Sequence, residues 1–207
     1  MLNKFYKLIE VAQKVLAENP YDLGHDLNHH YNVYDNVYHI ILNENIIKIN
    51  WDLVTVAAWW HDVDRDNNKH PRFTLAAKSL SIDDEVLEQI INIINTHSFT
   101  DRRSQSIEGK VLFDADKIEY ANPTRWIHID KAIIEGKMDL DRALKYGEAL
   151  NNRIADVYQS MTFNYSKARL TENIRFLIVA KKQGLFSSKI NQEIDWDILE
   201  SLVEKGK

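Results

Sequence analysis

The chain has 207 residues, of which 44% are hydrophobic and 28% charged, and this balance is typical of a soluble globular protein. It contains no cysteine, which excludes disulfides, thiolate metal sites and cysteine nucleophiles, so any metal must be held by nitrogen and oxygen ligands. The net charge of −5 argues against a general nucleic-acid-binding protein, which normally has a basic face. We expect a cytoplasmic protein, because no stretch is apolar enough to span a membrane and no secretory signal is recognisable.

Helical periodicity extends through almost the whole sequence, which holds only three prolines and six glycines. An all-α fold is therefore predicted, with a surface loop at the polar residues 63–72 and a polar connection at 98–106. No repeat, low-complexity tract or linker interrupts the pattern, so we expect a single domain over residues 1–207. The predicted helices cover residues 3–18, 27–43, 52–61, 107–120, 124–135, 140–162, 166–182 and 191–205, together with one that a Ser81 capping box begins and that ends near Asn95.

The second predicted helix carries a histidine pair at its start. Apolar side chains recur there at Val33, Val37 and Ile40, and the same spacing reaches back to His29. The pattern therefore predicts that His29 faces the core and that His30 is turned away.

The third predicted helix, capped by Asn50 or Asp52, ends in the sequence Trp59-Trp60-His61-Asp62-Val63-Asp64. Its small and apolar residues share a face with His61, so a second histidine is expected to point inward. Burying this imidazole and the adjacent carboxylate without partners would cost several kcal/mol. A divalent metal is one partner that would offset the cost, and an ordinary helix end with Asp62 in the following loop is the alternative.

Two later helices add further ligand types to apolar stripes. Extending the stripe of the helix that ends near Asn95 by one turn reaches His97, which is a candidate additional ligand. Asp116 follows Leu112 by four residues and projects from the apolar face, whereas Asp114 lies about 200° away around the helix. Taken singly, such residues are usually core histidines or helix caps. Together, two imidazoles and two carboxylates suit a divalent ion such as Mn²⁺, Fe²⁺, Co²⁺, Ni²⁺, Zn²⁺ or Mg²⁺.

The order His, then His-Asp, then Asp resembles the HD-domain superfamily of metal-dependent phosphohydrolases, and looks most like its small bacterial members, some of which act on nucleotides. The resemblance covers about residues 22–135 and implies an HD-domain helical bundle, with about 136–207 as a helical C-terminal extension. It implies metal ligands at His29, His61, Asp62 and Asp116. The elements that carry it are His29-His30-Tyr31-Asn32-Val33, Trp59-Trp60-His61-Asp62-Val63-Asp64 and Phe113-Asp114-Ala115-Asp116-Lys117-Ile118.

The activity implied is hydrolysis of a phosphoester or phosphoanhydride bond, in a nucleotide or similar small phosphorylated metabolite, by metal-activated water. Some family members place a catalytic Glu one helical turn after the motif histidine, where this chain has Arg65. Asp64 and Asp66 are nearby substitutes for proton transfer. The preferred phosphate-binding cations are Arg65 and Lys117, and with Asp62 and Asp64 they complete the candidate catalytic set. Further cations follow ligand-bearing segments at Lys69, Arg72 and Arg103.

Two other function classes stay open at this stage. Some HD-fold proteins hold two irons with extra histidines and activate O₂, and His97 keeps this oxygenase interpretation open. A non-catalytic binding or regulatory module is the other. The later helices carry no further cluster of ligand types, and they are assigned to scaffold, substrate-pocket wall or homo-oligomer contact.

Overall fold

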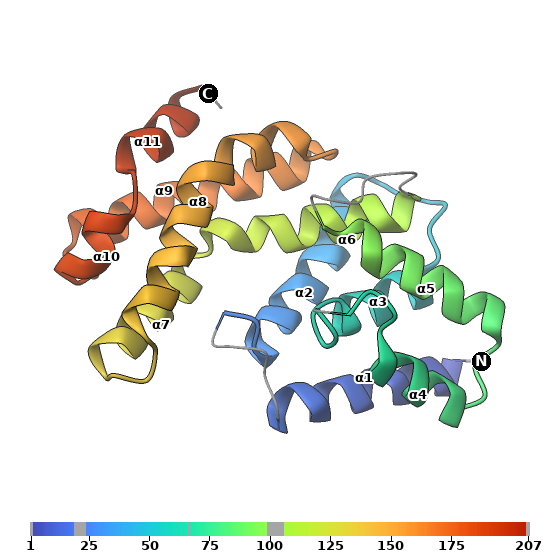
Figure 1. Ribbon diagram of the computed structural model, residues 1–207. Helices are drawn as coiled ribbons and strands as arrows, with labels where there is room; N and C mark the ends of the chain where they lie inside the picture. Colours follow the sequence, from blue (N-terminus) through green and yellow to red (C-terminus); the bar gives the residue numbers. More distant parts are fainter. Residues whose placement is uncertain (1, 19–23, 66, 99–105, 206–207) are drawn as a thin grey trace. The chain divides into compact units, whose positions relative to one another are not determined.

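The computed structural model describes residues 2–18, 24–65, 67–98 and 106–205 (Figure 1). Every regular element within these ranges is a helix, which confirms the predicted all-α fold. Among the helices of these ranges, none is both long enough and apolar enough to cross a bilayer. The chain divides into two compact units, Met1–Asp116 and Lys117–Lys207. Their boundary falls inside a helix and not in a linker, and the single-domain organisation stays a prediction.

The first unit is built around a short apolar helix, α3, which packs against α1, α2 and α5. From Leu53 to Trp60 all its side chains except Thr55 are buried, and a helix that is apolar on all sides belongs at the centre of a unit. The helices of this unit are α1 (Leu2–Glu18), α2 (Leu27–Asn43), α3 (Trp51–Trp60), α4 (Pro71–Ser79), α5 (Asp84–Thr96) and the main part of α6 (Ile107–Ile118).

The second unit is centred on α9, which contacts α7, α11 and the 3₁₀ helix η1. The side chains of Asn122 and Asp139 cap α7 and α8, as local signals predict for short polar residues at a helix start. The elements here are η1 (Glu119–Ala121), α7 (Pro123–Ile134), α8 (Leu140–Ser160), α9 (Asn164–Lys182), α10 (Ser188–Glu193) and α11 (Trp196–Lys205).

Most predicted boundaries agree with the structure within two residues, and Asn50 is confirmed as the cap of α3. Three predictions are wrong. The predicted loop at 63–72 ends early, because Pro71 occupies the first turn of α4, where its missing N–H costs nothing. The helix predicted at 191–205 is two helices, α10 and α11, and Asp195 Oδ1 accepts the Ile198 N–H at the start of the second.

The third error concerns the predicted capping box at Ser81. The residue preceding α5 is Asp83, and it makes no side-chain cap hydrogen bond. Ser81 instead has a φ of 53°, in the left-handed region, and its N–H bonds the Lys78 carbonyl oxygen. Ser81 therefore belongs to the turn that closes α4, and a matching sequence pattern was not enough to set the cap.

Candidate metal centre

The first turn of α2 buries both members of the histidine pair. Asp26 precedes the helix, and its Oδ1 accepts the His29 N–H at 3.0 Å, which fixes where the helix begins. His29 is 3% exposed, as predicted, but His30 is 0% exposed. The prediction that His30 is turned away is therefore wrong. Its ring packs on that of His61, with 4.5 Å between the ring centroids, because α3 covers this side of α2 as well.

The end of α3 sets the orientation of two imidazoles through one carbonyl group. The Ala58 carbonyl oxygen lies 2.8 Å from His61 Nδ1 and 3.2 Å from His30 Nδ1. Because a carbonyl oxygen only accepts hydrogen bonds, both rings carry a hydrogen on Nδ1 and direct it to this oxygen. Such a bond fixes the ring and leaves Nε2 free for a ligand, as in many protein metal sites.

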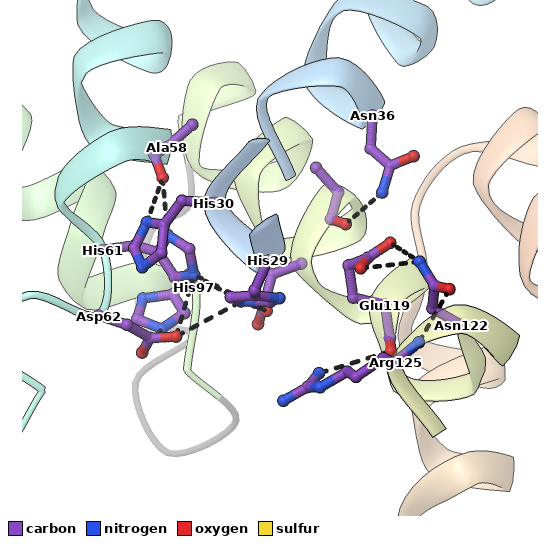
Figure 2. Close-up of polar contacts among 12 residues, drawn as sticks. His29, His30, Asn36, Ala58, His61, Asp62, His97, Glu119, Asn122 and Arg125 are labelled. Atoms are coloured by element: carbon purple, nitrogen blue, oxygen red, sulfur yellow. Dashed lines mark hydrogen bonds and ion pairs between the residues drawn. The ribbon is translucent and has the colours of Figure 1, made fainter. Parts of the chain in front are cut away.

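Four buried ligand atoms meet next to this carbonyl. One atom each from His29, His61, Asp62 and Asp116 lies within 4.8 Å of all the others. His29 Nε2 is 3.2 Å from His61 Nε2, 3.5 Å from Asp62 Oδ2 and 3.4 Å from Asp116 Oδ1. His61 Nε2 is 3.1 Å from Asp62 Oδ2 and 3.9 Å from Asp116 Oδ1. Figure 2 shows the side chains of His29, His61 and Asp62 turned toward one another.

These separations fit a common central ion. Ligands bound at about 2.0–2.2 Å from one divalent ion lie about 3–3.5 Å from each other. Four of the five separations given above, from 3.1 to 3.5 Å, match this spacing. Two imidazole nitrogens and two carboxylates are a donor set that suits several divalent transition metals. The buried cluster could therefore hold a metal ion.

The electrostatics of the cluster also favour a positive charge at its centre. Burial alone would raise the pKa of the Asp62 carboxyl, but the charges of His61 and His25 and hydrogen bonds from His29 and His61 hold it well below its usual value. Burial, with the nearby charges of His61 and His29, lowers the pKa of His30 well below the ordinary histidine value. Asp62 therefore stays ionised and His30 neutral, and either protons or a metal ion must balance the ligand atoms.

Two further imidazoles lie beside the four ligands. His97, at the end of α5, has its Nε2 3.8 Å from Asp62 Oδ1 and its ring 5.1 Å from that of His61. The helical stripe thus placed it correctly. His25 was missed, although its ring lies 5.5 Å from that of His29 and it is 9% exposed. The spacing of four residues between His25 and His29 was an available signal, but His25 precedes the helix.

Asp116 reaches the cluster from α6, as its apolar stripe predicts. Asp114, on the other side of the same helix, is also fully buried, because every residue from Val111 to Glu119 is buried. Burial by itself therefore does not distinguish the two aspartates. Asn36 of α2 donates its Nδ2 hydrogen to the Ala115 carbonyl oxygen at 3.1 Å and so ties α2 to the residue preceding Asp116.

Asp64 is buried, and both oxygens of its carboxylate already accept hydrogen bonds from the start of α4. Its oxygens accept the backbone N–H groups of Arg72 at 2.9 Å and Phe73 at 3.2 Å, and the Arg72 Nε at 2.8 Å. These contacts satisfy the first turn of α4, which has no cap from the side chain of His70. Asp64 therefore has a structural role at the start of α4, and its catalytic role stays a prediction.

The predicted phosphate-binding cations lie in different surroundings. Arg65 Nη1 is 3.6 Å from Asp62 Oδ1, while 43% of the Arg65 side chain is exposed. Lys69 is exposed. Lys117 is buried, with its Nζ 5.5 Å from the centroid of the Tyr120 ring, and it begins the second unit. Asp66 and Arg103 lie outside the described residues.

Comparison with known proteins supports the fold alone. No family model matches the chain, and no curated protein matches it. Among solved structures, the chain is similar to a Lactobacillus plantarum protein determined as a structural genomics target, with a TM-score of 0.67 and 17% sequence identity. The match covers 88% of this chain and 95% of the other. At this identity the likeness extends to the arrangement of helices and not to activity.

Proposed function

We propose that this protein is a metal-dependent phosphohydrolase that cleaves a phosphoester or phosphoanhydride bond in a small phosphorylated molecule of the nucleotide type. The observation that carries the proposal is the convergence of His29, His61, Asp62 and Asp116 on one buried point. The resemblance to the HD-domain phosphohydrolases supports it, since those four residues match that family's ligand positions.

The first role of the chain's own residues is to hold a metal. Asp62 is ionised, and the bond to Ala58 holds the His61 ring with its Nε2 directed at the other ligand atoms, so both side chains are oriented for coordination before any ion binds. A bound divalent ion supplies a Lewis acid that polarises a phosphoryl oxygen and activates water as a nucleophile.

The second role is to bind the phosphoryl group, which we assign to Arg65. Its guanidinium lies 3.6 Å from Asp62 Oδ1, and its side chain is 43% exposed, so it reaches both the cluster and solvent. A planar guanidinium binds phosphate oxygens in pairs and balances the charge that develops on them during attack. This role also accounts for an arginine at the position where some HD-domain proteins have a catalytic Glu.

Proton transfer does not fall to Asp64 in this proposal. Both Asp64 oxygens accept hydrogen bonds from Arg72 or from the first turn of α4, so moving a proton through this carboxylate would disrupt the start of that helix. Asp62 is the remaining carboxylate of the motif next to Arg65, and with the metal it is expected to orient the attacking water.

A second candidate function, a di-iron oxygenase, is favoured by one observation. His97 and His25 bring two more imidazoles next to the four ligands, and additional histidines are what a second iron would require. The two functions differ in metal content. One metal per chain with phosphate release supports hydrolysis, whereas two irons per chain with O₂ consumption supports the oxygenase.

The experiment that tests the proposal joins metal analysis to a substrate screen. The purified protein is analysed for bound metals and then incubated with Mn²⁺, Co²⁺ or Mg²⁺ and a panel of nucleotides and other phosphorylated metabolites, with phosphate or pyrophosphate release as the readout. Wild-type protein should release product, and D62A should lose at least about 100-fold in kcat/KM because the ion loses a ligand.

A matched control is D83A, because Asp83 is exposed and makes no side-chain hydrogen bond at the start of α5. It should keep wild-type activity and metal content. Equal activity in wild type and D62A would contradict the proposal. Metal binding without turnover of any compound in the panel would favour a binding or regulatory module.

A further inference from the structure

Helix α2 carries a row of exposed apolar side chains on the side opposite His29. Tyr31 is 48% exposed, Tyr34 36%, Tyr38 43% and Leu42 54%. The spacings of three, four and four residues place these side chains within about 80° of one another around the helix. Surface helices normally carry polar residues on this side, so the row is an exception that needs an explanation.

Tryptophans of α3 extend this row into an aromatic surface. The Tyr31 ring meets the buried Trp59 ring edge-on, with 4.7 Å between centroids, and the Tyr34 ring lies 6.0 Å from Trp59. The Tyr38 ring lies 5.8 Å from that of Trp51, which is 37% exposed. Rings packed against others have already lost side-chain freedom, so covering them costs little further entropy. We call the residues Tyr31, Tyr34, Tyr38, Leu42 and Trp51 the α2 patch.

Two polar residues, an acidic one and a histidine, flank the α2 patch on one side, and their charges are complementary when the histidine is protonated. Asp35 has 69% of its side chain exposed and His39 45%, and the His39 Nε2 lies 3.6 Å from Asp35 Oδ2. Along the helix, Asp35 and His39 are centred on residue 37. The row from Tyr31 to Leu42 is centred at almost the same level, between residues 36 and 37. A two-fold axis through this point would bring Tyr31 of one helix against Leu42 of another, and Asp35 against His39.

We propose that the α2 patch is a homodimer interface in which α2 of one copy packs antiparallel against α2 of a second copy, across a two-fold axis that passes through the patch at the level of residue 37 along the helix. In the antiparallel arrangement the same side of α2 is used by both copies, and the two helices run in opposite directions. Asp35 of each copy then lies against His39 of the other, which gives two equivalent contacts. In a parallel two-fold pair, the Asp35 and His39 sides of the two helices lie at opposite edges of the interface, so Asp35 would not meet His39 of the other copy. The charges therefore favour the antiparallel, isologous arrangement.

The exposed area of the α2 patch is large enough for a dimer interface. With typical side-chain areas, the α2 patch, Asp35 and His39 together expose about 600 Å² per copy, or about 1,200 Å² over two copies. Specific interfaces begin at about 1,000–1,200 Å² in total, and the aromatic composition of the patch is that of an interface core.

Sedimentation of the full chain over a concentration series tests the proposal, with Y38E/L42E as the disrupting variant. Wild type should be a dimer at micromolar concentration, and Y38E/L42E should weaken dimerisation at least about 100-fold by burying two unpaired carboxylates at the centre. L75E is the matched control, because Leu75 of α4 is 72% exposed and lies outside the patch. Circular dichroism confirms that each variant is folded. A wild-type monomer at about 100 µM, or equal weakening by L75E, would overturn the proposal.

The orientation is tested by charge reversal and by cross-linking. D35K should weaken the dimer, and D35K/H39D should restore it, because the reversed pair still meets in the antiparallel arrangement. Since the native chain has no cysteine, Y38C places one thiol per copy close to the axis and should form a disulfide-linked dimer under mild oxidation, whereas L75C should not. Failure of D35K/H39D to restore dimerisation, or equal cross-linking of Y38C and L75C, would contradict antiparallel packing through α2.

Discussion

Two buried polar clusters, one in each unit, use similar residues for different purposes (Figure 2). In the second unit, both Glu119 oxygens lie 3.0 Å from Asn122 Nδ2, and Asn122 Oδ1 accepts the N–H groups of Thr124 and Arg125. Donors and acceptors alternate there, so the chain satisfies its own hydrogen bonds. In the first unit, ring nitrogens of His29 and His61 meet carboxylates of Asp62 and Asp116.

The difference shows what separates a structural cluster from a candidate metal centre. Both contain buried carboxylates, so the burial of a carboxylate is not diagnostic. What differs is the kind of atom that converges: two imidazole nitrogens and two carboxylates meet at one point in the first cluster, whereas in the second a single carboxylate meets the amide group of Asn122. Such an arrangement could hold a metal ion, whereas the hydrogen-bonded Glu119 cluster offers only one carboxylate.

The largest effect is expected from the two aspartates of α6. D116N replaces a charged ligand by a neutral amide and should weaken Mn²⁺ or Co²⁺ binding by at least about 100-fold, while D114N, equally buried but outside the cluster, should change it by less than about fivefold. Isothermal titration calorimetry measures both. Equal losses in the two variants would show that burial and not ligation determines the affinity.

A change in the Glu119 cluster should affect stability but not metal binding. E119A removes the acceptor of the half-buried Asn122 amide and should lower the free energy of unfolding by about 1 kcal/mol, because the hydrogen bonds between the two side chains are lost. Urea denaturation measures this loss, and calorimetry should give wild-type metal affinity. A loss of metal binding in folded E119A would contradict the distinction between the clusters.

D64N separates the two roles considered for this residue. As the group that satisfies the start of α4, Asp64 should contribute about 1–2 kcal/mol to stability, mainly through the charge-assisted bond to Arg72 that the amide weakens. The kcat/KM of folded D64N should stay within about tenfold of wild type. A fall of a thousandfold with unchanged stability would instead make Asp64 a catalytic base.

The smallest effect is a change in the pH dependence of stability. Because burial lowers the pKa of His30 in the folded chain, the unfolded chain takes up this proton first as pH falls below about 6.5. Stability of the metal-free protein should therefore decline between about pH 6.5 and the lowered pKa, by at most about 1.4 kcal/mol per pH unit from this group. H30Q should flatten the decline, and H128Q, at an exposed position, should not. Denaturation in a chelator at several pH values gives the comparison.

The sequence by itself determined the helical character of the chain and the inward direction of His29, His61, His97 and Asp116. These properties depend on the period of the helix and on the apolar residues beside each ligand, and both are local. The same local reasoning found the Asn50 cap and the end of α9 at Lys182.

Only the tertiary structure decided which other polar side chains are buried and which already have hydrogen-bond partners. His30 and Asp114 are buried although they lie off the predicted inward faces, because neighbouring elements cover their helices on more than one side. His25 joins the cluster from outside any helix, where no period applies. Asp64 is occupied because α4 begins at Pro71 and brings two N–H groups and Arg72 to its carboxylate. Such partners come from other elements or from the segments between helices, and the period of a single helix does not place them.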